Sequence, residues 1–135
     1  MKPQISGGGT SAGTALAFVA GFVDAAAFIA LTGLFTAHVT GNFVLIGAEL
    51  IASSTGVLAK LLALPVFMGA VAGARILALL LQRREADPLP WLLALEAALL
   101  AGFGVCGTLW APLDAPDGAP ALTVGMLAVA AMGVQ

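Results

Sequence analysis

The sequence predicts an all-α fold, a polytopic bundle of transmembrane helices, and three observations support this prediction. Hydrophobic residues make up 61% of the chain, charged residues only 9%, and the mean hydropathy is +1.08. A soluble domain ordinarily carries about 25% charged residues. The apolar residues also form runs of about 20, the length that crosses ~30 Å of hydrocarbon as a helix. We therefore predict four spans, the second of them short, and the truncated start of a fifth.

Composition also argues against several classes of function. The net charge is −2 and the largest basic cluster is Arg83-Arg84, so no nucleic-acid-binding surface is expected. Cys106 is the single cysteine and can form neither an intrachain disulfide nor a CxxC metal site. The Gly-rich segment at residues 7–13 has no preceding strand and no P-loop lysine. Because no nucleophile–base pair is visible either, we predict no enzymatic activity, no cofactor and no metal.

The first span is predicted at residues 13–34, after a Gly- and Ser-rich segment at residues 1–12 that we expect to be flexible. This span opens a transmembrane domain that covers residues 13–135, and it is longer than the apolar core of a signal peptide. Asp24 lies beside a stripe of small residues, so its carboxyl group should face a partner helix or a cavity. The stripe recurs every four positions and suits close helix packing: Gly13, Ala17, Gly21 and Ala25.

The second apolar segment, residues 36–51, holds the only histidine of the chain together with an asparagine and two threonines. If this segment is one helix, His38, Asn42 and Glu49 lie within about 40° of each other on one face. Its length is at the short limit for a span. A helix broken near Thr40-Gly41, or a re-entrant segment, is therefore a second interpretation.

Two further spans are predicted at residues 57–81 and 89–110, and a fifth apolar segment begins near Ala121. The earlier of the two spans contains a GxxxG pair, Gly69 and Gly73, which favours close packing between helices. The fifth segment is still apolar where the sequence ends and is too short there for a full span. We therefore expect the chain to be incomplete.

The basic residues set the expected orientation in the membrane. Arg83 and Arg84 place the loop 82–90 in the cytoplasm, and the loop that carries Asp114 and Asp117 then lies outside. The N-terminus is outside if the second segment crosses the membrane, and inside if that segment is re-entrant.

Charged side chains inside a bilayer are costly, by about 2.5–3.5 kcal/mol on insertion scales, and usually face the interior of a bundle. Arg75 and Glu96 flank the cytoplasmic loop at similar depth, roughly 10 Å in, so we predict an ion pair that is structural or acts as a gate. Asp24 has no basic residue at its level, and a partner such as His38 or Asn42 is expected. Such a contact suits either a structural hydrogen bond or proton transfer, since histidine ordinarily changes its charge near neutral pH.

The leading functional prediction is a transporter of a small molecule or an ion, in one form coupled to protons. The alternative is a non-transporting membrane scaffold, accessory or lipid-interacting protein, in which the polar side chains only join helices. Small-residue stripes are compatible with internal packing and with a homo-oligomer. In the leading prediction the pathway is lined by polar residues of the first two segments: Asp24, His38, Thr40, Asn42 and, near its mouth, Glu49.

Residues 21–47 resemble the YoaK-like family of bacterial multi-pass inner-membrane proteins, which carry a domain of unknown function. The ending AMGVQ, residues 131–135, resembles the family's Met-Gly-x-Gln-Asn segment. The resemblance of the longer segment rests on Gly21, Asp24, Ala25, Phe28, Phe35, Ala37, His38, Thr40, Gly41 and Asn42.

This resemblance implies a helical fold in the bacterial inner membrane, and it implies that the chain covers about the first three-fifths of a family member. It provides no substrate. It also implies an internal repeat, in which residues 21–24 correspond to residues 133–135 and a following Asn. Internal repeats of this kind are common in secondary transporters.

Overall fold

The computed structural model describes residues 7–52 and 55–135, and their side chains from residue 11 onward. Residues 1–6 of the segment predicted to be flexible lie outside this part, whereas residues 7–12 belong to the first helix. The all-α prediction is confirmed. The described residues form five helices and no strand: α1 (Gly7–Ala30), α2 (Gly41–Ala52), α3 (Val57–Gln82), α4 (Leu89–Leu109) and α5 (Ala119–Val134).

Three of these helices are long and apolar enough to cross a membrane, which indicates a membrane protein. They are α1, through its 20 residues Ser11–Ala30, α3 with 26 residues and α4 with 21. Helix α2 has 12 residues and α5 has 16. At about 1.5 Å per residue neither reaches across ~30 Å of hydrocarbon. The described chain therefore has three helices long enough to span a membrane and two shorter apolar helices, and four full spans are not confirmed.

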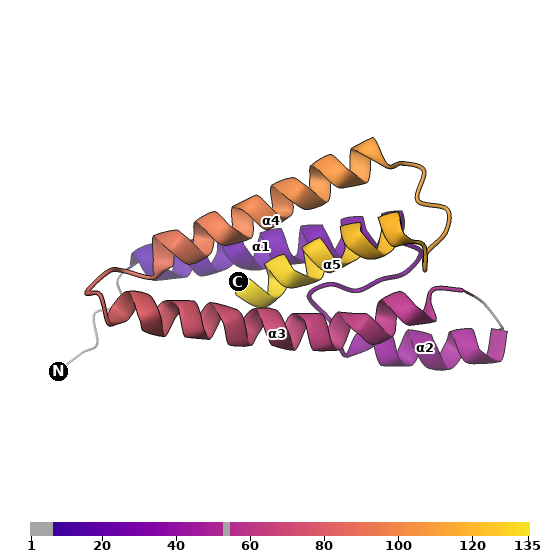
Figure 1. The fold of residues 1–135 in the computed structure, drawn as a ribbon, viewed down its shortest axis with the longest axis horizontal. Coiled ribbons are helices and arrows are strands. Elements are labelled where there is room, and N and C mark those ends of the chain that lie inside the picture. The colour runs from indigo at the N-terminus through magenta and orange to yellow at the C-terminus, as the bar shows by residue number, and fades with distance from the viewer. Residues whose placement is uncertain (1–6, 53–54) are drawn as a thin grey trace.

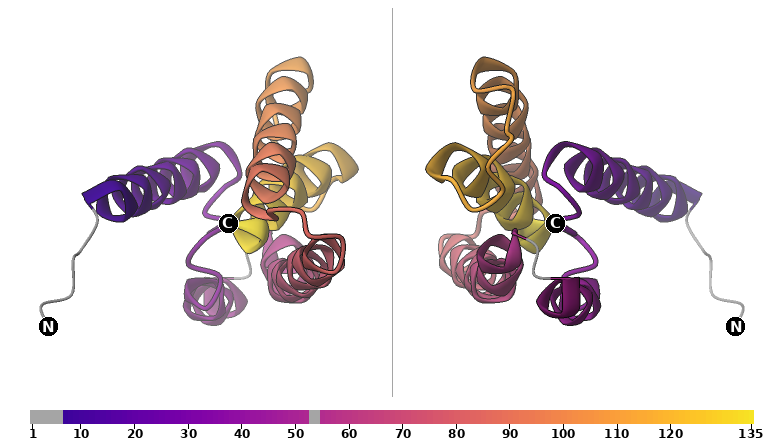
Figure 2. Two further views of the ribbon diagram at one scale, coloured as in Figure 1. Left: turned by 90° about the vertical axis from the view of Figure 1, so that its left-hand side faces the viewer. Right: turned by 90° about the vertical axis from the view of Figure 1, so that its right-hand side faces the viewer.

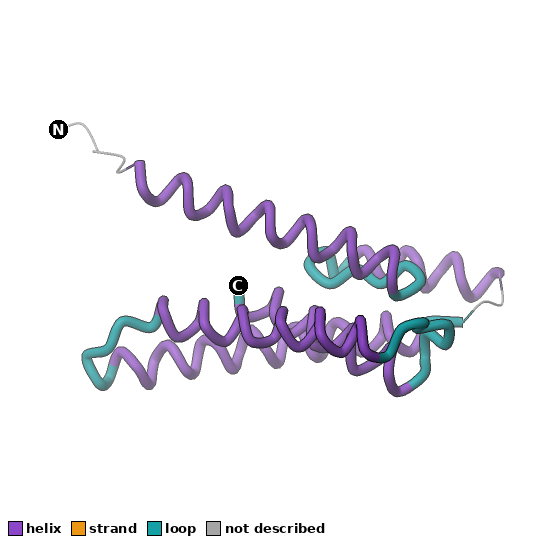
Figure 3. The backbone as a smooth tube through the Cα atoms, turned by 90° about the horizontal axis from the view of Figure 1, so that it is seen from above, coloured by secondary structure: helices purple, strands orange, loops and turns teal. Residues whose placement is uncertain are grey.

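The helices are arranged in two layers. Figure 3 shows α1, α2 and the loop between them on one side, and α3, α4 and α5 on the other. Within the second layer, α5 lies between α3 and α4 and packs against both (Figure 1). Helix α2 packs against α3. Helix α1 diverges from the bundle, and α5 is the one helix of the described chain that it contacts (Figure 2).

Helix α5 forms the centre of the core because its side chains are small. Ala128, Val129 and Ala131 are fully buried in it. Gly133 lies directly against α3, since a Cβ atom there would come within 2.7 Å of the Ala70 Cβ and 2.8 Å of the Phe67 carbonyl oxygen. In lipid, where burial of apolar surface adds little, such close backbone contact is what holds helices together.

Replacing Gly133 by alanine should therefore destabilise the contact between α3 and α5. Overpacking of this kind costs about 1–3 kcal/mol, and the thermal midpoint of the detergent-solubilised protein should fall. Gly69→Ala is the matched control, because a Cβ at Gly69 on α3 would meet nothing within 4 Å. That control should be neutral or stabilising, given the higher helix propensity of alanine. Equal midpoints for the two variants would contradict the close approach at Gly133.

The chain reverses direction after α1. Thr32 and Gly33 adopt positive φ angles of 51° and 85°, which the glycine adopts without strain. The loop at residues 31–40 then runs back beside α1, and α2 returns to the end of the bundle where α1 stops and α3 begins (Figures 1 and 3). The second apolar segment is thus a loop followed by a short helix, which agrees with the helix broken near Thr40-Gly41 in the second interpretation of the sequence.

The single helix predicted over residues 36–51 is wrong, because α2 begins only at Gly41. His38 and Thr40 therefore lie in the loop, and they do not share a helical face with Asn42 and Glu49. The polar stripe expected on that face does not exist.

The small-residue stripe of α1 is not covered by any helix of the described chain. All four of its residues are exposed, and a Cβ at Gly13 or Gly21 would meet nothing within 4 Å. The same holds for Gly69 and Gly73 on α3. The close packing predicted for these glycines is therefore not made within the described residues, in contrast to that of Gly133.

Candidate functional site

Asp24 is the residue that holds the reversing loop against α1. Its Oδ1 atom accepts hydrogen bonds from the backbone N–H of Thr36 at 2.6 Å and of Ala37 at 2.8 Å, and from the Thr36 hydroxyl at 3.2 Å. Its Oδ2 atom lies 2.7 Å from Nδ1 of His38. A loop inside a membrane must have its backbone groups satisfied by protein, and this carboxylate satisfies two of them at once.

The imidazole of His38 is fixed by this contact at one nitrogen. An ionised carboxylate can only accept hydrogen bonds, so Nδ1 carries the hydrogen in this contact and donates a hydrogen bond to Oδ2 of Asp24. Nε2 is then the acceptor of the ring. The Asp24 side chain is 8% exposed whereas that of His38 is 77% exposed. An aspartate thus orients a histidine whose second nitrogen is accessible, as in many proton-transfer and metal sites.

This accessible imidazole borders an open, surface-facing cavity of about 670 Å³ between α1 and the loop. A cavity of this volume is in the range of small-molecule sites, which are mostly apolar with a few polar groups. Asp24 and His38 are its charged or titratable members. The other lining residues are apolar or glycine: Gly21, Ala25, Phe28, Ile29, Phe35 and Gly41.

Two further residues predicted to line the pathway have other positions. Asn42 is buried and bonds both backbone groups of Phe35, accepting from its N–H at 2.9 Å and donating to its carbonyl at 2.8 Å. It therefore closes the loop onto the start of α2. Thr40 is exposed in that loop. The threonine that contacts Asp24 is Thr36. In the sequence analysis this residue was only the first residue of the second apolar segment.

Glu49 forms an ion pair with Lys60, a residue that the sequence analysis missed. Nζ of Lys60 lies 2.6 Å from Oε1 of Glu49, and the two side chains are 1% and 17% exposed. A single lysine four residues into an apolar span is typical of an interfacial anchor whose ammonium group reaches water. Its spacing of 11 residues from Glu49, across a short turn, was the available signal for a pair.

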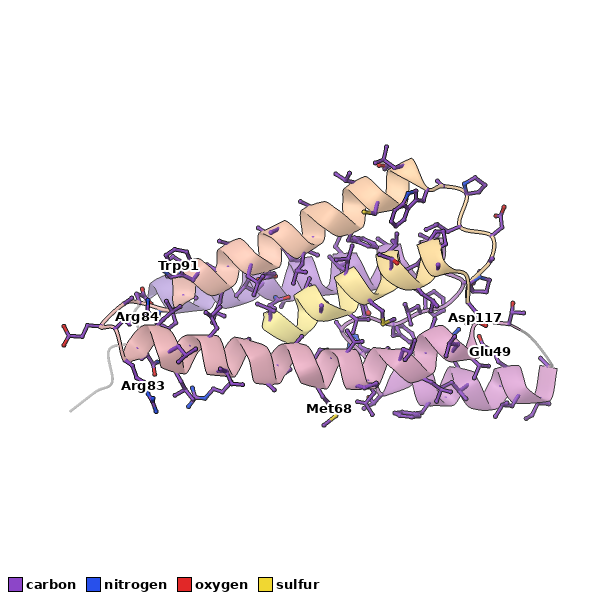
Figure 4. The ribbon with its side chains drawn as sticks, in the orientation of Figure 1. Glu49, Met68, Arg83, Arg84, Trp91 and Asp117 are labelled. Carbon is purple, nitrogen blue, oxygen red and sulfur yellow. The ribbon has the colours of Figure 1, made fainter. Side chains whose placement is uncertain are left out.

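Asp117 ties the connection between α4 and α5 to the start of α3. Its carboxylate accepts hydrogen bonds from the backbone N–H groups of Gly56 at 2.9 Å and Ala59 at 3.2 Å. It thereby caps a helix that begins 60 residues earlier in the chain and favours its N-terminal dipole. Figure 4 shows Glu49 and Asp117 at one end of the bundle, and Arg83 and Arg84 at the other.

The ion pair predicted between Arg75 and Glu96 is not formed in the described residues. Arg75 is exposed on α3, whereas Glu96 is buried on α4. The prediction assumed that α3 and α4 pack as an antiparallel hairpin, but α5 lies between them. Arg75 and Glu96 therefore lie on helices that pack mainly against α5 rather than against each other.

The described residues contain no group of three or more His, Cys, Asp and Glu side chains that could hold a metal ion.

Comparison with known proteins gives one family. Residues 12–135 match the model of a protein family of unknown function, DUF1275. No curated protein and no solved structure matches the chain. Because the match covers nearly the whole sequence, the chain belongs to the DUF1275 family of proteins of unknown function.

Proposed function

We propose that this protein is a proton-coupled transporter of a small molecule, in which His38 carries the proton. The observation that supports the proposal is the imidazole that Asp24 orients at Nδ1 and leaves accessible at Nε2, on the wall of a cavity between α1 and a reversing loop. The site needs no cofactor and catalyses no reaction. The resemblance to YoaK-like proteins supports a place in the bacterial inner membrane.

The position of this pair favours a pathway over a purely structural contact. Titratable side chains within membrane segments are costly and commonly mark substrate or proton routes. Irregular backbone at membrane depth is tolerated where it is buried in protein or lines an aqueous cavity, and broken segments line the sites of many secondary transporters. The loop that contains His38 resembles such segments, since Asp24 bonds two of its backbone N–H groups and the cavity borders the His38 side chain.

Proton transfer follows from the tautomer of His38. Nε2 accepts a proton from the substrate or from water in the cavity, and the resulting imidazolium is stabilised by the Asp24 carboxylate at 2.7 Å. Release of that proton on the other side of the membrane completes the cycle. In this proposal Arg83 and Arg84 mark the cytoplasmic end. Because the second segment re-enters rather than crosses, the N-terminus lies on the cytoplasmic side as well.

The competing function is a non-transporting scaffold or accessory protein. Residues of the loop engage both carboxylate oxygens of Asp24, which is what a network that only stabilises the loop would require. The two functions differ in whether water reaches the cavity. Single cysteines in a Cys106→Ala background separate them: Ala25→Cys on the cavity wall, and Ala72→Cys, an exposed position near the middle of α3, as the lipid-facing control.

A transporter requires a membrane-impermeant thiol reagent to label Ala25→Cys and to leave Ala72→Cys unreactive. Protection of both positions would favour the structural function.

In proteoliposomes that contain a pH-sensitive dye, we expect His38→Gln to reduce solute-driven proton uptake about 10²-fold or more, since loss of a positioned proton-transfer group has effects of that size. The solutes are a panel of amino acids, organic acids, sugars and inorganic cations. Asp114→Asn, at an exposed loop position, should leave uptake unchanged.

A further inference from the structure

We propose that Glu49 and Lys60 form a proton-operated latch, in which one proton bound at Oε2 of Glu49 releases the re-entrant hairpin, residues 31–52, from α3. The latch is separate from the Asp24–His38 pair and lies at the end of the bundle opposite Arg83 and Arg84 (Figure 4). It needs no substrate, so it does not depend on the transport proposal.

The ammonium group of Lys60 joins three parts of the chain. Besides Oε1 of Glu49 on α2 at 2.6 Å, it donates to the Thr32 carbonyl at the end of α1 at 3.3 Å and to the Gly56 carbonyl before α3 at 3.5 Å. Its side chain is 1% exposed. The ammonium group of Lys60 thus contacts both ends of the hairpin, Thr32 and Glu49. A buried ammonium is costly without a counterion, and Glu49 provides that counterion.

Oε2 of Glu49 is buried and has no hydrogen-bond partner among the described residues. A buried polar atom without a partner is rare in folded proteins, and it often marks a functional group or a bound ion or water. A proton at this oxygen would remove the unsatisfied negative charge. It would also remove the counterion of Lys60, so the interaction that holds the hairpin would weaken.

Three charged side chains meet at this end of the bundle. The titratable groups that face the cluster are Glu49 from α2, Lys60 from α3 and Asp117 from the connection between α4 and α5. The end of α1 contributes only the carbonyl of Thr32. Asp117 is already satisfied by the N–H groups at the start of α3. Two carboxylates and one ammonium are thus grouped here, and Oε2 of Glu49 is the carboxylate oxygen that has no hydrogen-bond partner among the described residues.

Little else holds the far end of α2. Only Asn42 and Ile46 are buried in this helix, and Asn42 is at its beginning. The large apolar side chains near its end, Leu50 and Ile51, are exposed. The Asp24 contacts anchor the loop, so loss of the Glu49–Lys60 pair leaves α2 anchored at its start and held at its end mainly by the short connection to α3. A hinge at the loop and a latch at the helix end follow from this arrangement.

The test measures the distance between spin labels on Ala48→Cys in α2 and Leu61→Cys in α3, both exposed positions, in Cys106→Ala protein reconstituted in phospholipid vesicles. We expect a single short distance at neutral pH and a growing long-distance population on acidification. A one-proton latch changes the ratio of released to held hairpin by at most about tenfold per pH unit. Glu49→Gln, which mimics the protonated carboxyl group, should give the long distance at every pH.

Two controls protect this test against simple misfolding. Lys60→Arg keeps the charge and should keep the pH response, and Glu85→Gln makes the same substitution at an exposed site on the opposite end of the bundle. His38→Gln should also respond to pH as the unmodified protein does, which separates the latch from the proposed transport site. A pH response that survives in Glu49→Gln would overturn the proposal, because the proton would then bind elsewhere. So would a distance that is the same at all pH values in every variant, because the pair would then be static.

Discussion

Replacing Asp24 by alanine should lower the free energy of unfolding by about 3–5 kcal/mol. The substitution leaves the backbone N–H groups of Thr36 and Ala37 and the Thr36 hydroxyl without the acceptor they now share. Each buried donor that loses its partner costs about 1–3 kcal/mol, and bonds to a charged group are the stronger ones. Backbone groups of a membrane segment cannot turn to water instead. The loop at residues 31–40 should therefore lose its position against α1.

Three variants measured by denaturation in detergent would test this expectation. Asp24→Asn keeps one acceptor oxygen for the loop but presents an amide to His38, so it should cost less than alanine. Asp114→Ala removes an exposed carboxylate from a loop and should change stability by no more than about 0.5 kcal/mol. Hydrogen exchange at the Thr36 and Ala37 amides should accelerate in Asp24→Ala. A stability loss equal to that of Asp114→Ala would show that the carboxylate does not hold the loop.

The boundaries of α3 and α4 were predictable because they depend on local composition, whereas α1 begins six residues before the span predicted at residues 13–34 and ends four residues before that span ends. Spans expected at residues 57–81 and 89–110 agree within one residue with α3 and α4, since apolar runs there meet the polar loop around Arg83 and Arg84. The break before α2 was one of two interpretations of the segment, suggested by Thr40-Gly41. The contact between Asp24 and the loop decides between the two interpretations. Asp24 lies outside the segment, so the sequence of the segment alone could not decide.

The pairing of charged residues was much less predictable than the helices. The loop between α3 and α4 predicts that Arg75 and Glu96 lie at a similar depth. It does not predict which helices are neighbours, because that depends on how the whole bundle packs. The small side chains of α5 allow it to enter between α3 and α4, and this insertion separates the two charges. A contact between helices that are distant in sequence requires the tertiary structure.

Lys60→Met should be the second strongly destabilising change, costing about 3–5 kcal/mol at neutral pH. Methionine fills a similar volume but removes the ammonium group, so Glu49 keeps a buried charge without a counterion. Breaking a buried pair by removing one partner typically has an effect of this size, whereas replacing both partners is often neutral. The sequence analysis did not single out Lys60, because a lysine near the start of a span ordinarily extends to water and contributes little.

The double variant Lys60→Met with Glu49→Gln provides the decisive comparison. If the cost of Lys60→Met arises from the stranded carboxylate, the double variant should recover most of the lost stability. The cost of the single variant should also shrink as the pH falls, because a proton neutralises Glu49. Arg84→Met, which removes an exposed cation from the opposite end of the bundle, should have little effect at any pH. A double variant as unstable as Lys60→Met alone would mean that the bonds of Lys60 to the Thr32 and Gly56 carbonyls, rather than its charge, hold the hairpin in place.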